Sequence, residues 1–237
     1  MNNIEKNYNY IKHYILYEDN HIIVIVKDFN IPVQKDSSND ISLIELIKDY
    51  LKFKYNKPGN VFLGIVHRLD RPVGGILVFA KTSKAAKRLS KAMIDNKIKK
   101  IYYAIVENIC IGKNILLKDY LWKDKERNIV KIASPIDIKN KKAKLCKLIY
   151  STIETNKEKN ISLLEINLLT GRSHQIRVQI SNINHSIVGD VKYFSKTMTR
   201  NIALWSYNLE FEHPIKKEKM SFKKLPPDIE PFKFFKY

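Results

Sequence analysis

The sequence predicts an α+β fold, built on a mixed, largely antiparallel central β-sheet with flanking helices. Segments with strand-like patterns outnumber helical ones, and their order is mixed instead of the regular alternation of a doubly wound parallel sheet. Two β-rich runs, residues 145–154 and 161–169, lie on either side of the polar loop 156–160 and predict an antiparallel pair. The 237 residues, 44% of them hydrophobic, are enough to bury a core.

The first half of the chain predicts buried strands separated by a helix. The apolar cluster I-I-V-I-V within residues 14–27 indicates a short buried strand, and residues 75–80 indicate another. Between them, Ile44, Ile47 and Leu51 follow helical spacing. No repeat or flexible linker divides the chain, so we expect a single domain over residues 15–237 after an N-terminal extension over residues 1–14.

A second helix is predicted after Thr82 or Ser83, either of which can cap its first turn. Apolar side chains form one face of this helix and basic side chains form the other; the apolar set is Ala85, Ala86, Leu89, Ala92 and Met93, and the basic set is Lys84, Lys87, Arg88 and Lys91. Between residues 81 and 100, eight of twenty residues are Lys or Arg against one acid. The helix therefore offers an apolar side to the core and a basic side to solvent or phosphate.

The second half adds a strand over residues 101–107 and a helix near residue 176. Ile176, Ile180 and Ile183 lie on one helical stripe, after a Thr170-Gly171 turn and a polar first turn.

The net charge of +19 is the first functional indication, because a basic chain without a membrane segment commonly binds polyanions. Compositional bias in a Lys-, Ile- and Asn-rich chain is the alternative, but the clustering after residue 80 favours organised charge. The polar N-terminus and short apolar runs predict a soluble cytoplasmic protein. Cys110 and Cys146 stand alone in apolar contexts and are expected to be small core residues, with neither a disulfide framework nor a zinc site.

Asp70 stands in the stretch H-R-L-D-R-P-V-G-G, between Arg68 and Arg71 and just before an apolar run. One interpretation is a structural ion pair with a neighbouring arginine. The other is a working nucleophile or base, because a nearby arginine keeps a partly buried carboxylate ionised. The residues around Asp70 leave both interpretations open, and the glycine pair fits close ligand approach or a β-bulge equally well.

Two further stretches carry candidate binding residues. T-G-R-S-H-Q-I-R-V-Q, residues 170–179, gathers long donors at a helix start, which favours anion binding over a merely solvated helix end. K-I-Y-Y-A-I-V, residues 100–106, places two adjacent tyrosines on a strand, where they must face opposite ways. One of the two tyrosines is expected in the core and the other at a site.

Together the motifs H-R-L-D, K-x-Y-x-A and T-G-R-x-H-Q-I-R, in this order, resemble those of the RluA-type RNA pseudouridine synthases. The resemblance runs from about residue 15 to residue 231 and includes the segments I-L-Y-E-D-N-H, G-D-V-K-Y and A-L-W. It implies isomerisation of uridine to pseudouridine in rRNA or tRNA, the pseudouridine synthase fold, no metal or organic cofactor, and a monomer. The S4 RNA-binding module of many relatives has no room before residue 15, so the catalytic domain is expected to supply its own RNA contacts.

Carried over position by position, the resemblance makes Asp70 the catalytic aspartate, Tyr102 the active-site tyrosine that stacks on the base, and Arg177 the arginine paired with the carboxylate. Tyr103 is then the core-facing neighbour. The remaining cationic and polar residues are expected to contact RNA: Arg68 and Arg71, freed from pairing with Asp70, the basic-helix residues Lys84, Lys87, Arg88 and Lys91, and Arg172, His174, Gln175 and Lys192.

The sequence departs from the common family pattern at several positions, which are Val73-Gly74-Gly75 after the aspartate, Asp28 after Lys27, Gln179, and Phe194 after Tyr193. None belongs to the implied catalytic set. Whether Asp70 attacks C1′ or removes a proton from C2′ stays open. Two alternatives of another kind also stay open: a non-catalytic RNA-binding or ribosome-assembly protein, and an N-glycosidase that releases uracil.

Overall fold

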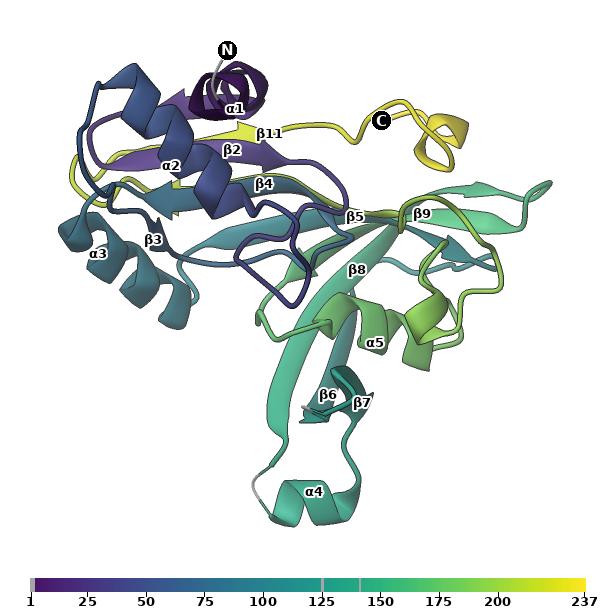
Figure 1. Cartoon of the computed structure of the whole chain (residues 1–237). Coiled ribbons are helices and arrows are strands. Elements are labelled where there is room, and N and C mark those ends of the chain that lie inside the picture. Colours follow the sequence, from purple (N-terminus) through teal and green to yellow (C-terminus); the bar gives the residue numbers. More distant parts are fainter. Residues whose placement is uncertain (1–2, 125, 141) are drawn as a thin grey trace. The chain divides into compact units, whose positions relative to one another are not determined.

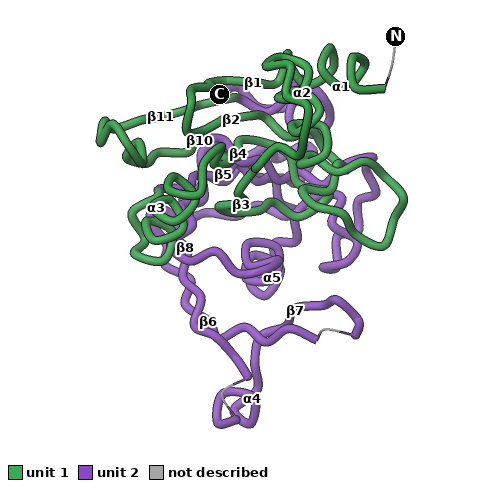
Figure 2. The backbone as a smooth tube through the Cα atoms, turned by 60° about the vertical axis from the view of Figure 1, so that its left-hand side comes forward, with its two compact units in different colours: residues 1–98, 208–224 green, residues 99–207, 225–237 purple. Residues whose placement is uncertain are grey.

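The computed structural model describes residues 3–124, 126–140 and 142–237 (Figure 1). Residues 1 and 2 of the expected N-terminal extension lie outside the described residues. The chain divides into two compact units: unit 1 comprises residues 1–98 and 208–224, and unit 2 comprises residues 99–207 and 225–237 (Figure 2). The single domain over residues 15–237 stays a prediction.

The described residues of unit 1 form helices and a sheet with the strand order β1-β2-β4-β10-β11, in which β3 also pairs with β4. Its elements are α1 (Asn3–Ile11), η1 (Lys12–Tyr14), β1 (Ile15–Glu18), β2 (Ile22–Lys27), α2 (Leu43–Lys54), β3 (Gly64–Ile65), β4 (Gly74–Ala80), α3 (Ser83–Ile94), β11 (Lys219–Lys223) and the second half of β10 (Leu204–Glu212).

The strands β2 and β4 are buried along their whole length, as continuous apolar runs predict. They pair antiparallel, from Ile22 opposite Ala80 to Lys27 opposite Gly75. The helix α3 is capped by Thr82 and packs Ala85 and Leu89 into the same core, which confirms its predicted apolar face. The helix α2 begins at a capping box, in which the Ser42 and Glu45 side chains satisfy each other's backbone N–H groups.

Unit 2 contains a fully antiparallel sheet with the order β5-β9-β8-β6-β7, and the first half of β10 lies beside β5. Its elements are β5 (Lys99–Glu107), β6 (Ile115–Asp124), β7 (Ile129–Ile132), α4 (Pro135–Lys139), β8 (Lys144–Asn156), β9 (Ile161–Leu168), α5 (Gln175–Asn182), η2 (Val191–Tyr193) and η3 (Phe232–Phe234).

The helix α5 covers one face of this sheet (Figure 1). Val178 of α5 packs with Leu121, Val130 and Cys146 of the strands. Cys146 and Cys110 are both buried and unpaired, as expected for small core residues. Among the described residues no helix is long and apolar enough to cross a bilayer.

The predicted fold class is confirmed, as is the antiparallel pair β8–β9. Sequence reasoning missed α1, the ribbon of β6 and β7 with its small terminal helix α4, and the strands β10 and β11.

Candidate active site

Asp70 lies in a turn immediately before β4. The Val73 N–H donates to the Asp70 carbonyl at 3.0 Å, and the flanking Leu69 and Val73 side chains are buried. His67 is tied to the same strand, because the Val78 N–H donates to its Nε2 at 3.3 Å. Gly75 adopts a positive φ of 117°, which favours glycine and accounts for one member of the glycine pair. The turn thus holds the Asp70 backbone while its side chain is partly exposed.

Lys27 fastens this turn to the loop after β2, a role that sequence reasoning missed. Its side chain is fully buried, and Nζ donates at 2.9 Å to each of three carbonyl oxygens, those of Asp28, Ile31 and Arg71. Three acceptors require three N–H donors, which only the ammonium form supplies. Burial lowers the pKa of Lys27 to about 7, although the charges of Asp28 and Asp70 oppose the shift in part. In the sequence, the indication of this role is a lysine, Lys27, at the end of an otherwise apolar strand.

Replacing Lys27 by Met is expected to change the pH dependence of stability. Because the folded pKa of about 7 lies below the ordinary 10.5, unfolding takes up a proton between these values, and wild-type stability rises with pH across this window. The free energy of unfolding of Lys27→Met relative to wild type should therefore fall by about 2 kcal/mol from pH 7 to pH 9. Urea unfolding at both pH values measures this, and a constant difference would contradict it.

The two arginines beside Asp70 have other partners within unit 1. The Arg71 guanidinium donates to the carboxylates of Asp36 and Asp40 and to the Ser38 hydroxyl. Arg71 is therefore not unpaired, because the acidic 36–40 loop binds its guanidinium, and its contact with RNA stays a prediction. Arg68 is exposed and donates to Gln34 Oε1 at 3.1 Å, a weaker neutral partner that leaves most of the guanidinium donors available.

The two tyrosines of β5 face opposite ways, as their positions require. Tyr102 is the more buried, with 5% of its surface exposed. Tyr103 is half-buried and stacks on Tyr207, with ring centroids 4.3 Å apart, and on Tyr237. The expectation that Tyr103 faces the core is therefore wrong: it belongs to an aromatic stack on the other face of the sheet.

Lys100 connects the second and third motifs within unit 2. It lies two residues before Tyr102 on β5, so both side chains share one face. Only 5% of its surface is exposed, and burial lowers its pKa. Its Nζ lies 3.3 Å from the position that a Cβ on Gly171 would take. A larger residue than glycine in the T-G-R motif would therefore crowd the Lys100 ammonium.

The start of α5 holds the polar residues of the third motif. His174 occupies the N-cap position with a left-handed backbone (φ 52°), and its Nδ1 lies 2.6 Å from the Tyr193 hydroxyl. Gln175 is buried: it accepts from Thr170 Oγ1 and the Arg172 N–H, and it donates to the Lys147 carbonyl and Gln179 Oε1. These four hydrogen bonds use Gln175 to hold the loop before α5, and its contact with RNA stays a prediction.

Arg177 forms a buried, bidentate ion pair with Asp190. Its Nε donates to Oδ2 at 2.6 Å and its Nη2 to Oδ1 at 2.7 Å, with both side chains almost completely buried. The guanidinium carbon also lies 4.9 Å from the centroid of the Tyr193 ring. Asp190 was missed as a site residue, although it stands in the G-D-V-K-Y segment. The pairing of Arg177 with Asp70 joins residues of different units and stays a prediction.

The basic residues lie on the surfaces of their units. On α3, Lys84, Lys87, Arg88 and Lys91 are all exposed. Arg88 donates to the Pro214 carbonyl at 2.7 Å, and Lys91 pairs with Asp95 at 3.1 Å. Arg172 and Lys192 of unit 2 are exposed as well. Cationic side chains are therefore available in both units.

These features fit the chemistry that the motifs imply. An aspartate on a braced turn can act as nucleophile or base. A buried guanidinium and a buried tyrosine, in turn, can order a substrate.

The comparisons with known proteins agree with the three motifs. The sequence pattern of the family described as RNA pseudouridylate synthase matches residues 21–182. Ribosomal large subunit pseudouridine synthase C of Buchnera aphidicola subsp. Baizongia pistaciae is 34% identical over 218 residues, covering 86% of this chain and 64% of that protein. Ribosomal large subunit pseudouridine synthase D of Zymomonas mobilis is 30% identical over 229 residues, covering 91% of this chain and 70% of that protein.

Among solved structures, human RNA Pseudouridylate Synthase Domain Containing 4 has a similar fold, with a TM-score of 0.75 and 17% sequence identity over 94% of this chain and 93% of that chain. The chain spans about two thirds of the length of the curated relatives described above. The family match includes Asp70, Tyr102 and Arg177. The chain belongs to the RNA pseudouridylate synthase family, and its RluA-type resemblance is confirmed.

Proposed function

We propose that the chain isomerises uridine to pseudouridine in large-subunit ribosomal RNA, with Asp70 as the catalytic carboxylate. The observation that carries this proposal is the family match over residues 21–182, which contains all three ordered motifs. The names of the two relatives described above support a ribosomal target. The basic charge and the exposed cations on both units support a polyanionic substrate.

In the proposed reaction the bond between uracil N1 and ribose C1′ breaks, the base turns, and C5 forms a bond with C1′. The proton on C5 leaves to solvent and N1 gains one, so the product is an isomer of the substrate. Asp70 acts as nucleophile at C1′ or as base at C2′. The uridine leaves the base stack for this chemistry, with Tyr102 against the base and Arg177 as the cationic partner of the carboxylate.

The test uses ribosomal RNA that carries tritium at uracil C5. Release of tritium to water, with pseudouridine in the digested RNA, is the expected result. A chain that only binds RNA would release none, and an N-glycosidase would release free uracil, which chromatography detects. Mapping pseudouridines in RNA from cells that lack the protein then identifies the modified positions.

The basic face of α3 is expected to contribute to RNA binding. Replacing Lys84, Lys87, Arg88 and Lys91 by Gln should weaken binding, with most of the effect from Lys84 and Lys87, because Arg88 and Lys91 have partners within the protein. Loss of two phosphate contacts lowers the slope of log affinity against log salt by about 1.4 for single-stranded RNA. Fluorescence anisotropy across salt concentrations measures the slope.

A second variant replaces only Lys84 and Lys87 by Gln. Its matched control replaces Lys48 and Lys52, which lie one turn apart on α2, so that both variants lose two positive charges. The Lys48 and Lys52 variant should keep the wild-type slope. An unchanged slope in the Lys84 and Lys87 variant would instead show that the α3 face is only solvated.

A further inference from the structure

The ribbon formed by β6, β7 and β8 has two different faces. Side chains alternate between the two faces along each strand. On one face, Leu121 packs with Val178 of α5, and Asp119 accepts a hydrogen bond from Gln179 of α5 at 2.6 Å. The intervening residues of β6 therefore point to the opposite side, away from α5.

The strand register shows which side chains gather on that opposite side. Lys118 lies directly opposite Lys147, Tyr120 opposite Leu145, and Trp122 opposite Lys131. Residues directly opposite each other share a face of the sheet. These six residues, Lys118, Tyr120, Trp122, Lys131, Leu145 and Lys147, are named here the ribbon outer face.

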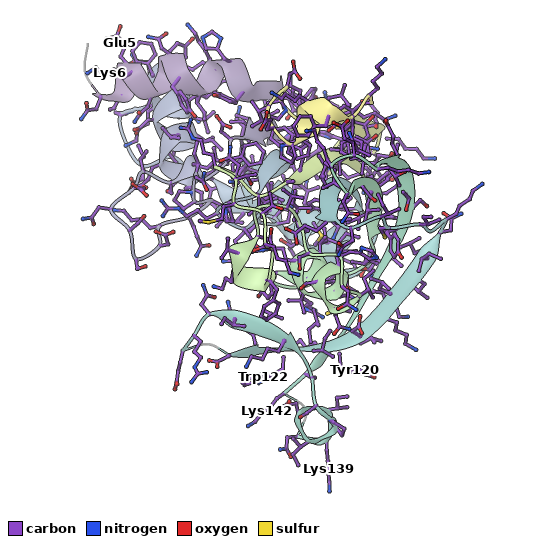
Figure 3. The ribbon with its side chains drawn as sticks, turned by 90° about the vertical axis from the view of Figure 1, so that its right-hand side faces the viewer. Glu5, Lys6, Tyr120, Trp122, Lys139 and Lys142 are labelled. Carbon is purple, nitrogen blue, oxygen red and sulfur yellow. The ribbon has the colours of Figure 1, made fainter. Side chains whose placement is uncertain are left out.

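The ribbon outer face is accessible and combines aromatic with basic side chains. Tyr120 is 40% exposed, Lys118 and Lys131 are exposed, and Trp122 and Lys147 are half-buried. In Figure 3, Tyr120 and Trp122 lie on the ribbon between the rest of unit 2 and the tip that carries Lys139 and Lys142.

Within the described part of the chain, none of the three lysines makes a side-chain hydrogen bond or an ion pair. Neither aromatic ring contacts another aromatic ring or a cation there. Among the described residues, the fold thus leaves the charges of this face without polar partners and its rings without aromatic or cationic ones.

The pairing of Lys118 with Lys147 costs stability, because like charges directly opposite each other in a sheet repel. Two cations held side by side, next to two aromatic rings, match a polyanion whose bases are free to stack. Single-stranded RNA has this chemistry, since its phosphates meet the lysines and its unpaired bases stack on tyrosine and tryptophan.

We propose that the ribbon outer face binds a single-stranded segment of the substrate RNA, outside the catalytic residues. The proposal rests on the proposed function for the identity of the RNA. The face is separate from Tyr102, because the register from β5 through β9 and β8 places Tyr102 with Ile166, Tyr150 and Ile115, on the side of the sheet that α5 covers.

The test measures binding of a fluorescein-labelled oligouridylate to the full chain across salt concentrations. Replacing Lys118 and Lys147 by Gln should lower the salt slope by about 1.4. Tyr120→Ala and Trp122→Ala should each weaken binding about fivefold or more. The two Ala variants should affect a blunt RNA duplex of equal length less, because its bases are already stacked.

The control replaces Lys113 and Lys157 by Gln, because both are exposed in loops of unit 2 and the charge change is the same. This variant should keep the wild-type slope and affinity. Circular dichroism of every variant establishes that it is folded. Wild-type affinity and slope in the folded Lys118 and Lys147 variant would overturn the proposal. The face would then be a candidate surface for a protein partner in place of RNA.

Tritium release from labelled ribosomal RNA separates this proposal from the proposed function. Variants of the ribbon outer face should raise KM about fivefold or more while kcat stays at the wild-type value. If the wild type binds RNA through this face but releases no tritium, the proposed function fails and the binding face stands. If the wild type releases tritium and the variants keep its KM, the binding face fails alone.

Discussion

Replacing Asp70 by Asn should reduce tritium release from ribosomal RNA by at least about a thousandfold while RNA affinity stays near the wild-type value. The amide keeps the size of the side chain but is neither a nucleophile at C1′ nor a base at C2′. The turn that carries Asp70 is braced by main-chain contacts, from Val73 and through Lys27 to Arg71. These main-chain contacts remain in Asp70→Asn, so its circular dichroism spectrum should match that of the wild type.

Asp95→Asn is the matched control, because Asp95 is an exposed carboxylate at the end of α3 and the chemical change is the same. It should keep wild-type turnover. Undiminished tritium release by Asp70→Asn would remove Asp70 from the catalytic role. Loss of both turnover and RNA binding would mean that the carboxylate holds the site together, as in the ion-pair interpretation of the H-R-L-D stretch.

The sequence predicted the parts of this protein that rest on local patterns. Apolar runs located β2 and β4 because both strands are buried on both faces, and helical spacing located α3 with its cap at Thr82. The ribbon of β6 and β7 was not predicted, because only one of its faces is buried. Leu121 is the single fully buried side chain of β6. A strand with lysines and exposed apolar residues gives little periodic signal.

The sequence motifs predicted the residues of the candidate site, but they did not predict the contacts that support those residues. H-R-L-D and T-G-R-x-H-Q-I-R identified Asp70 and Arg177 by resemblance, yet the groups that brace them come from distant segments. Lys27 reaches the turn from the end of β2, and Asp190 follows Arg177 by thirteen residues across a loop. Such pairings depend on tertiary packing, and hence no local pattern reports them. The same holds for Arg71, whose acidic partners lie more than thirty residues earlier.

Asp190→Asn is expected to lower the free energy of unfolding by about 3–5 kcal/mol, because it removes the negative charge from a buried, bidentate ion pair with Arg177. The amide oxygen of the variant side chain can still accept one hydrogen bond, so the loss comes mainly from the missing carboxylate charge. Urea unfolding measures it. Glu230→Gln, which breaks the exposed pair with Lys233 in the same unit, should cost less than about 1 kcal/mol.

A double variant, Arg177→Met with Asp190→Leu, separates the cost of breaking the buried ion pair from a loss of packing. Replacing both members of a buried ion pair by apolar residues of similar volume is often neutral or stabilising, so the double variant should regain most of the stability that Asp190→Asn loses. It should nevertheless release no tritium, because the guanidinium expected to pair with Asp70 is absent. If the double variant is as unstable as Asp190→Asn, the ion pair stabilises the protein through its packing around Tyr193 and not through charge balance. If it is stable and active, Arg177 has no part in the chemistry and serves only to neutralise Asp190.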